Sequence, residues 1–199
     1  VVGGPPTRQL FNDVWRSADG VNWTQVTAAA PWAARAGASV VVRDGYLYLF
    51  GGEYAFTGSP PPYFNDVWRT ANGADWELVT PAAGWSPRPG HTCDLLDGSF
   101  VCFGGYGQSP NPLDVFGRKS PMDMWTSDDG ATWANVTPGL GGLPEWGTVR
   151  TIEPSPHDAA TAYLVADAHR LDDYRPYLWR TRDYGKTWSR LAKDLEPDV

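Results

Sequence analysis

The sequence has few of the side chains that hold metal ions or redox cofactors. Its 199 residues include only two cysteines, two methionines and three histidines. The three histidines are scattered, and no pair of Cys or His residues has the spacing of zinc ligands. We therefore expect no metal site and no cofactor.

A cluster of basic residues and a long apolar run are also missing. The 16 Lys and Arg against 23 Asp and Glu give a net charge of −7, whereas nucleic-acid binding requires basic side chains gathered on the phosphates. A membrane-spanning helix needs a run of about 18 apolar residues, and the sequence has none. We therefore expect neither nucleic acid as a partner nor insertion into a membrane.

Tryptophan, by contrast, is abundant, and its 11 copies fall into three columns that repeat along the chain. The first column recurs at intervals of 53, 57 and 54 residues, and the other two follow in register. Regular spacing of so rare a residue indicates a repeat architecture. The columns are Trp15, Trp68, Trp125 and Trp179; Trp23, Trp76, Trp133 and Trp188; and Trp32, Trp85 and Trp146.

Each complete repeat carries the signals of two β-hairpins. Asp44-Gly45 and Asp97-Gly98 separate pairs of β-rich runs, and turns such as Asp19-Gly20 lie between the first two Trp columns. Asp and Gly tolerate the positive φ of tight hairpin turns. Two hairpins per repeat, with no helical period, predict an all-β fold: a β-propeller of about four four-stranded antiparallel blades. We place the blades at about residues 1–30, 31–83, 84–140 and 141–195, within one domain that spans residues 1–199.

The repeated residues resemble kelch repeats over residues 1 to about 138. An Arg and a Gly precede the first strand, Gly-Gly follows the second, and Asn65-Asp66-Val67-Trp68 lies on the third; the period of about 50 residues also fits. The last repeat lacks Gly-Gly, and its turn from Thr181 to Trp188 is similar to the Asp-box, or bacterial neuraminidase repeat. That blade resembles propellers of the sortilin and bacterial glycosidase kind. The resemblance implies a propeller and leaves its activity open.

The beginning of the chain aligns with the middle of a blade. Val1-Val2-Gly3-Gly4 matches Leu49-Phe50-Gly51-Gly52, whereas propellers usually have about 4–8 complete blades. We therefore expect this chain to be part of a larger propeller. The remaining blades would come from the rest of the chain or from another subunit.

The turn between the first two Trp columns carries an acidic or amide residue in every repeat. An Asp or Asn at a turn hydrogen-bonds its own backbone. A residue needed in every blade is expected to be scaffolding, because a catalytic site is needed only once. The predicted structural Asp-box residues are Asp19, Asn72, Asp128, Asp129 and Asp183.

The two cysteines lie on one predicted hairpin. If Asp97-Gly98 forms a two-residue turn, Cys93 lies directly opposite Cys102, at a separation near that of a disulfide. The alternative is two buried thiols in an apolar slot. We predict the disulfide, which implies an oxidising compartment: extracellular, cell surface or periplasmic.

Candidate ligand-binding residues gather on one predicted face. The kelch resemblance implies that the segments between blades and the long loops between second and third strands open on the same side. Arg and aromatic residues are enriched in binding hot spots. The alternatives are that the Trp residues pack between blades, that the Arg residues cap main-chain carbonyls, and that the loops merely tolerate insertions. The candidates are Arg35, Arg88, His91, Arg150, Tyr54, Tyr63, Tyr106 and Phe116.

Two functions remain after these observations. The first is a non-catalytic, extracellular β-propeller module that binds a protein or glycan through this face. The second is a fragment of a carbohydrate-active enzyme, sialidase-like or galactose-oxidase-like. Most acidic residues occupy repeated turn positions, and no paired carboxylates for glycoside hydrolysis stand out. We therefore favour the binding module, with no catalytic residues assigned.

Overall fold

The computed structural model describes residues 9–54, 63–108, 118–119, 123–143, 148–168 and 172–191, which form antiparallel β-sheets and a single 3-10 turn, η1 (Thr137–Gly139). The second repeat forms β3 (Ser39–Arg43), β4 (Tyr46–Glu53), β5 (Tyr63–Thr70) and β6 (Glu77–Thr80). The third forms β7 (His91–Leu96), β8 (Ser99–Gly104), β11 (Met124–Ser127) and β12 (Ala134–Asn135). The fourth forms β13 (Thr148–Pro154), β14 (Ala162–Ala168), β15 (Asp173–Thr181) and β16 (Ser189–Arg190).

The first repeat differs from the other three. Its described residues form only a two-stranded sheet, β1 (Val14–Arg16) with β2 (Thr24–Thr27). These strands correspond to the third and fourth strands of the other blades. A second small sheet pairs β9 (Gly107–Gln108) with β10 (Arg118–Lys119), in the long connection between β8 and β11. No helix in the described residues is long and apolar enough to cross a membrane.

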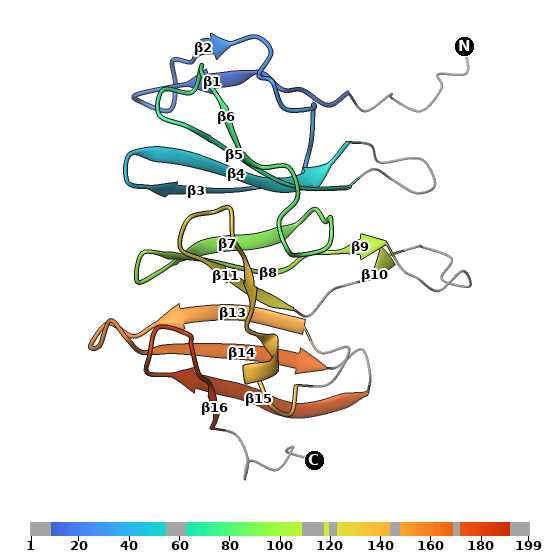
Figure 1. Ribbon diagram of the computed structural model, residues 1–199, viewed down its shortest axis with the longest axis vertical. Coiled ribbons are helices and arrows are strands. Elements are labelled where there is room, and N and C mark those ends of the chain that lie inside the picture. The colour runs from blue at the N-terminus through green and yellow to red at the C-terminus, as the bar shows by residue number, and fades with distance from the viewer. Residues whose placement is uncertain are drawn as a thin grey trace.

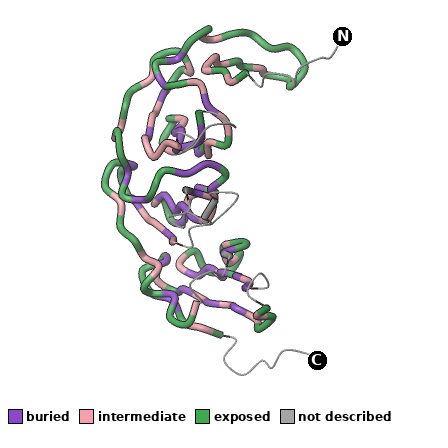
Figure 2. The backbone as a smooth tube through the Cα atoms, turned by 90° about the vertical axis from the view of Figure 1, so that its right-hand side faces the viewer, coloured by how far each residue is buried: buried purple, intermediate pink, exposed green. Residues whose placement is uncertain are grey.

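The sheets follow one another in chain order along the long axis of the molecule (Figure 1). Seen from the side, they lie on an open arc (Figure 2). The first strands of the second and third blades lie against each other: the Cys93 amide on β7 donates to the Ser39 hydroxyl on β3 at 2.9 Å. The first strand of the fourth blade, β13, contacts β8 of the third. The fold is therefore all-β with a propeller-like arrangement of sheets.

Aromatic side chains fill the spaces between neighbouring sheets. Phe50 and Phe100 are fully buried between the second and third blades, with ring centroids 5.4 Å apart. Trp179 is fully buried in the cluster between the third and fourth blades. In the first repeat, Trp15 and Trp23 are 48% and 57% exposed. The described Trp residues of the four-stranded blades are therefore either buried in a core cluster or packed against one.

The hairpin at Asp97-Gly98 confirms both the turn and the disulfide. Asp97 and Gly98 have φ angles of 49° and 76°, and Leu96 pairs with Ser99. Cys93 therefore lies opposite Cys102, and their sulfur atoms are bonded at 2.08 Å. Both cysteines are buried against the second blade. A disulfide at this position is compatible with a secreted or periplasmic protein.

The Asp-box turns are closed by hydrogen bonds within the turn. In the third blade, an Asp129 carboxylate oxygen accepts from the amides of Ala131 and Thr132 at 2.8 and 2.7 Å, and Trp133 Nε1 donates to the Gly130 carbonyl at 2.9 Å. Asp19 and Asn72 each accept from two turn amides in the same way, whereas Asp183 accepts from the amide and the hydroxyl of Thr187. Asp128 differs, because it accepts from the Ser99 hydroxyl at 2.5 Å outside the turn.

We expect Asp129→Ala to destabilise the protein without changing ligand binding. The substitution removes the acceptor for two backbone amides, a loss that typically costs about 1 kcal/mol. Thermal unfolding of the variant, compared with Asp128→Ala, measures this cost. An unchanged melting temperature together with lost binding would show that Asp129 serves a ligand and not the turn.

Candidate ligand-binding face

Two arginines hold the segments that join neighbouring blades, residues 28–38 and 81–90, which we call the connectors. Arg35 donates both terminal nitrogens to the Asp66 carboxylate, at 2.7 and 2.8 Å. Arg88 makes the same paired contact with Asp123. Bidentate pairs of this kind are among the stronger hydrogen-bonded ion pairs. The guanidinium of Arg35 also donates to the carbonyls of Ala33 and Gly51, and that of Arg88 donates to the carbonyls of Ser86 and Gly104.

The asparagine that precedes the aspartate in Asn12-Asp13 and Asn65-Asp66 binds the connector that follows it in the chain. Asn65 Nδ2 donates to the carbonyls of Ala83 and Trp85, at 3.0 and 2.9 Å, and Asn12 does the same for Ala30 and Trp32. The Asn-Asp pair therefore clamps two connectors at once, one through its amide and one through an arginine. Sequence reasoning missed this role, although the repeated Asn-Asp beside a repeated Arg was the available signal.

Arg35 and Arg88 are too deeply buried to contact a ligand, which requires an exposed side chain. Each arginine side chain is only 2% exposed. Their guanidinium donors are directed to aspartates and carbonyls of this chain, and Arg35 also lies 4.2 Å from the centre of the Phe64 ring. The prediction that these two side chains contact a ligand is therefore replaced here by a structural role in the connectors.

The connectors and the ends of the second strands lie on one face, which we call the connector face. The Gly52 amide donates to the Arg88 carbonyl at 3.0 Å, and the Tyr106 amide donates to Pro89 at 3.1 Å. An isolated β-bridge also joins Ala36 to Glu53. The described parts of the loops thus begin beside the connectors, as the kelch resemblance implies.

Two tyrosines, Tyr63 and Tyr106, lie beside a buried carboxylate on the connector face. Glu53 is 3% exposed and accepts a hydrogen bond from the Tyr106 hydroxyl at 3.0 Å. Tyr63 pairs with Glu53 across β4 and β5, and its ring meets that of Tyr106 edge to face at 6.0 Å. Tyr54 is 53% exposed. Glu53 and the two tyrosines link the second blade to the third; Phe116, also predicted for this face, lies outside the described residues.

His91 is buried beneath this face. It is 6% exposed, its ring lies 5.1 Å from that of Trp85, and neither nitrogen makes a hydrogen bond of good geometry with the described residues. Burial and then the Arg88 cation lower the pKa of His91 to about 4, against an opposing contribution from the Arg88 main chain. A neutral, buried imidazole packs against the connector and does not offer a charge to a ligand.

We expect His91 to make the protein less stable in mild acid. The unfolded chain binds a proton near pH 6.5 while the folded protein resists protonation until about pH 4, so the free energy of unfolding falls as the pH decreases through this window. His91→Leu should flatten the profile between these values. Urea unfolding at a series of pH values measures it, and identical slopes for both proteins would contradict the expectation.

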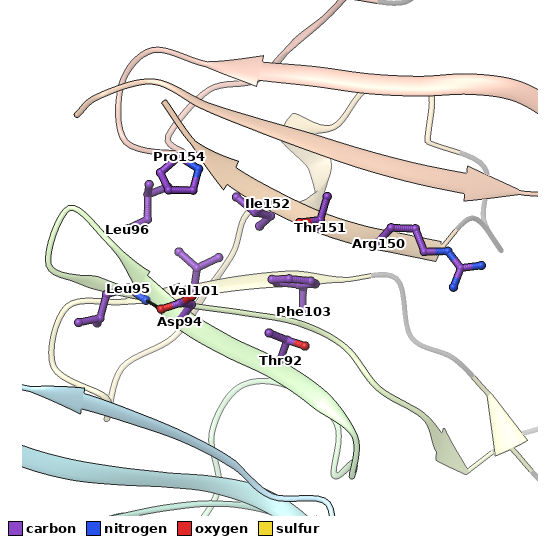
Figure 3. Close-up of a pocket in the computed structure, with 10 residues that line it drawn as sticks. All are labelled: Thr92, Asp94, Leu95, Leu96, Val101, Phe103, Arg150, Thr151, Ile152 and Pro154. Atoms are coloured by element: carbon purple, nitrogen blue, oxygen red, sulfur yellow. Dashed lines mark hydrogen bonds between the residues drawn. The ribbon is translucent and has the colours of Figure 1, made fainter. Parts of the chain in front are cut away.

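Arg150 occupies a different environment from Arg35 and Arg88. Its side chain is 50% exposed, and only its Nε contacts a carboxylate, that of Asp167. Arg150 lines a cleft of about 220 Å³ between the third and fourth blades (Figure 3). The three predicted arginines are therefore not brought together as one cluster.

Comparison with known proteins adds evidence on the fold. No family model matches the chain. The solved structure of YjhT aligns with 90% of this chain, with a TM-score of 0.56 and 16% sequence identity. The aligned chain spans about half, 52%, of the YjhT chain. At this identity the similarity is one of fold alone.

Proposed function

We propose that this chain is part of a kelch-like β-propeller, with an Asp-box blade at its C-terminal end, that serves as a non-catalytic binding module. Its place is the cell surface, the extracellular space or the periplasm, and its ligand is a protein or a glycan. The observation that carries the proposal is the pair of tyrosines, Tyr63 and Tyr106, beside the buried Glu53 on the connector face, with the exposed Tyr54 next in the sequence. Tyrosine offers rigid contact area with a polar end, which suits both kinds of ligand.

The clamped connectors support the same proposal. The Arg35–Asp66 and Arg88–Asp123 pairs fix the backbone beside the tyrosines. A surface held rigid before binding loses less conformational entropy when a ligand docks. The opposite end of the blades presents the Asp-box turns, whose polar groups are directed to their own backbone.

A fragment of a carbohydrate-active enzyme is the second candidate, and the Glu53–Tyr106 hydrogen bond favours it. A tyrosine with an acidic partner is one component of sialidase-like catalysis. Such catalysis also needs an arginine cluster on the substrate carboxylate. Arg35 and Arg88 are engaged by aspartates and buried, so the binding module remains the better supported function.

Screening the protein on a glycan array and against a displayed peptide library tests the proposal. For any ligand found, Tyr54→Ala should weaken binding about tenfold or more, as loss of an interface hot spot does. Tyr184→Ala is the matched control, because Tyr184 is exposed in the Asp-box turn of the fourth blade. Equal binding by wild type and Tyr54→Ala, with a loss in Tyr184→Ala, would contradict the proposed face.

A further inference from the structure

We propose that the cleft between the third and fourth blades binds one neutral sugar ring, such as the terminal residue of a glycan. This cleft is separate from the connector face, and the two sites have in common only that a glycan is a possible class of ligand. The cleft lies between β7 and β8 on one side and β13 on the other (Figure 3). Nothing in the repeated kelch positions predicts it, because β13 belongs to the blade that departs from the repeat.

The size of the cleft favours a single ring. Its volume is about 220 Å³, whereas pockets for drug-sized ligands have about 300–1,000 Å³. The walls are apolar and include Val101, Phe103 and Ile152. The C–H face of a sugar ring can pack against such walls, with its hydroxyl groups directed to the rim.

The polar groups of the lining provide both donors and acceptors for sugar hydroxyls. The terminal nitrogens of Arg150 make no hydrogen bond within the described part of the chain, and the Thr92 and Thr151 hydroxyls make none there either. Among the described residues, Asp94 accepts only from the neighbouring Leu95 amide, through one carboxylate oxygen. A hydroxyl group both donates and accepts. Asp94 and Arg150 lie toward opposite ends of the lining (Figure 3), so different hydroxyl groups of one ring would use them.

The charges of the lining favour binding of a neutral sugar over an acidic one. Asp167 already pairs with Arg150, and Asp94, the other charged residue of the cleft, is an anion. A sugar carboxylate would approach Asp94 without an unpaired cation to compensate. Neutral hydroxyl groups meet no such repulsion.

Chemical-shift titration of the isotopically labelled protein tests the inference. The probes are the methyl glycosides of galactose, glucose and mannose, with glucuronic acid as the charged comparison. At least one neutral glycoside should shift the amide signals of Thr92, Asp94 and Thr151 in a saturable way, with a millimolar Kd. Glucuronic acid should bind at least tenfold more weakly than that glycoside.

Variants separate the cleft from the connector face. Asp94→Ala and Arg150→Gln should each weaken the glycoside at least tenfold, while Asp44→Ala and Arg16→Gln, which alter exposed residues outside the cleft, should leave its Kd unchanged. Tyr54→Ala should also leave it unchanged, which distinguishes this site from that of the proposed function. The inference is overturned if no neutral glycoside saturates these signals, if glucuronic acid binds more tightly, or if the two cleft variants bind normally.

Discussion

Arg88→Ala is expected to lower the free energy of unfolding by about 3–5 kcal/mol, the typical cost of removing one partner from a buried ion pair. The Arg88 side chain is 2% exposed and that of Asp123 is 22% exposed, so the remaining carboxylate would be largely shielded from water. Burial raises the pKa of Asp123, but its contacts with Arg88 outweigh that effect and hold the pKa below the usual range. The pair therefore stabilises the folded connector.

Urea unfolding of Arg88→Ala, Asp123→Ala and the double variant measures this contribution. The double variant should be less destabilised than the sum of the two single variants, because it leaves no unpaired charge. Arg43→Ala is the control: Arg43 donates to the Asp128 carbonyl in an exposed hydrogen bond and should matter far less. Wild-type stability in Arg88→Ala would show that the connector does not depend on the pair.

Replacing both Cys93 and Cys102 with serine should lower the free energy of unfolding by about 3 kcal/mol. The disulfide closes a short loop of sequence separation 9, and a loop of about ten residues corresponds to this magnitude in the chain-entropy treatment. Both sulfur atoms are also buried between the second and third blades, so serine hydroxyl groups would add a cost.

Denaturant unfolding with and without a reducing agent measures the effect of the bond. The wild-type protein should lose stability on reduction, whereas the double serine variant should not respond. If reduction leaves the wild-type midpoint unchanged, the disulfide contributes nothing to the folded state. Mass spectrometry of the unreduced protein provides the independent count of free thiols.

Local signals explain what could be predicted from the sequence. The Asp97-Gly98 turn specifies its hairpin register, and counting outward from it is enough to place Cys93 opposite Cys102. The Trp columns mark core positions because each blade repeats the same packing; Trp179 and Trp85 are both almost fully buried. Patterns within one repeat therefore predict the four-stranded blades of repeats two to four.

Contacts between distant segments explain what the sequence could not show. The ion pair of Arg88 could not be predicted, because its partner, Asp123, lies 35 residues away in the chain. Arg88 was therefore predicted to contact a ligand. The cleft depends on how β13 packs against the third blade, where it contacts β8, and no repeated motif in the sequence specifies that packing. Asp128 and Asp129 both fit the turn pattern, and only the hydrogen bonds identify Asp129 as the turn residue.

Masking each end of the blades in turn tests most directly whether the connector face is the binding face. Tyr54→Cys and Val21→Cys each place a thiol on an exposed position, the first on the connector face and the second in an Asp-box turn. A bulky polyethylene-glycol maleimide attached to either thiol then covers that end, and the native cysteines do not react because they are bonded to each other. Binding to the strongest array glycan or library peptide is compared before and after labelling. The account predicts that labelling at position 54 abolishes binding and that labelling at position 21 does not; the reverse result would contradict it.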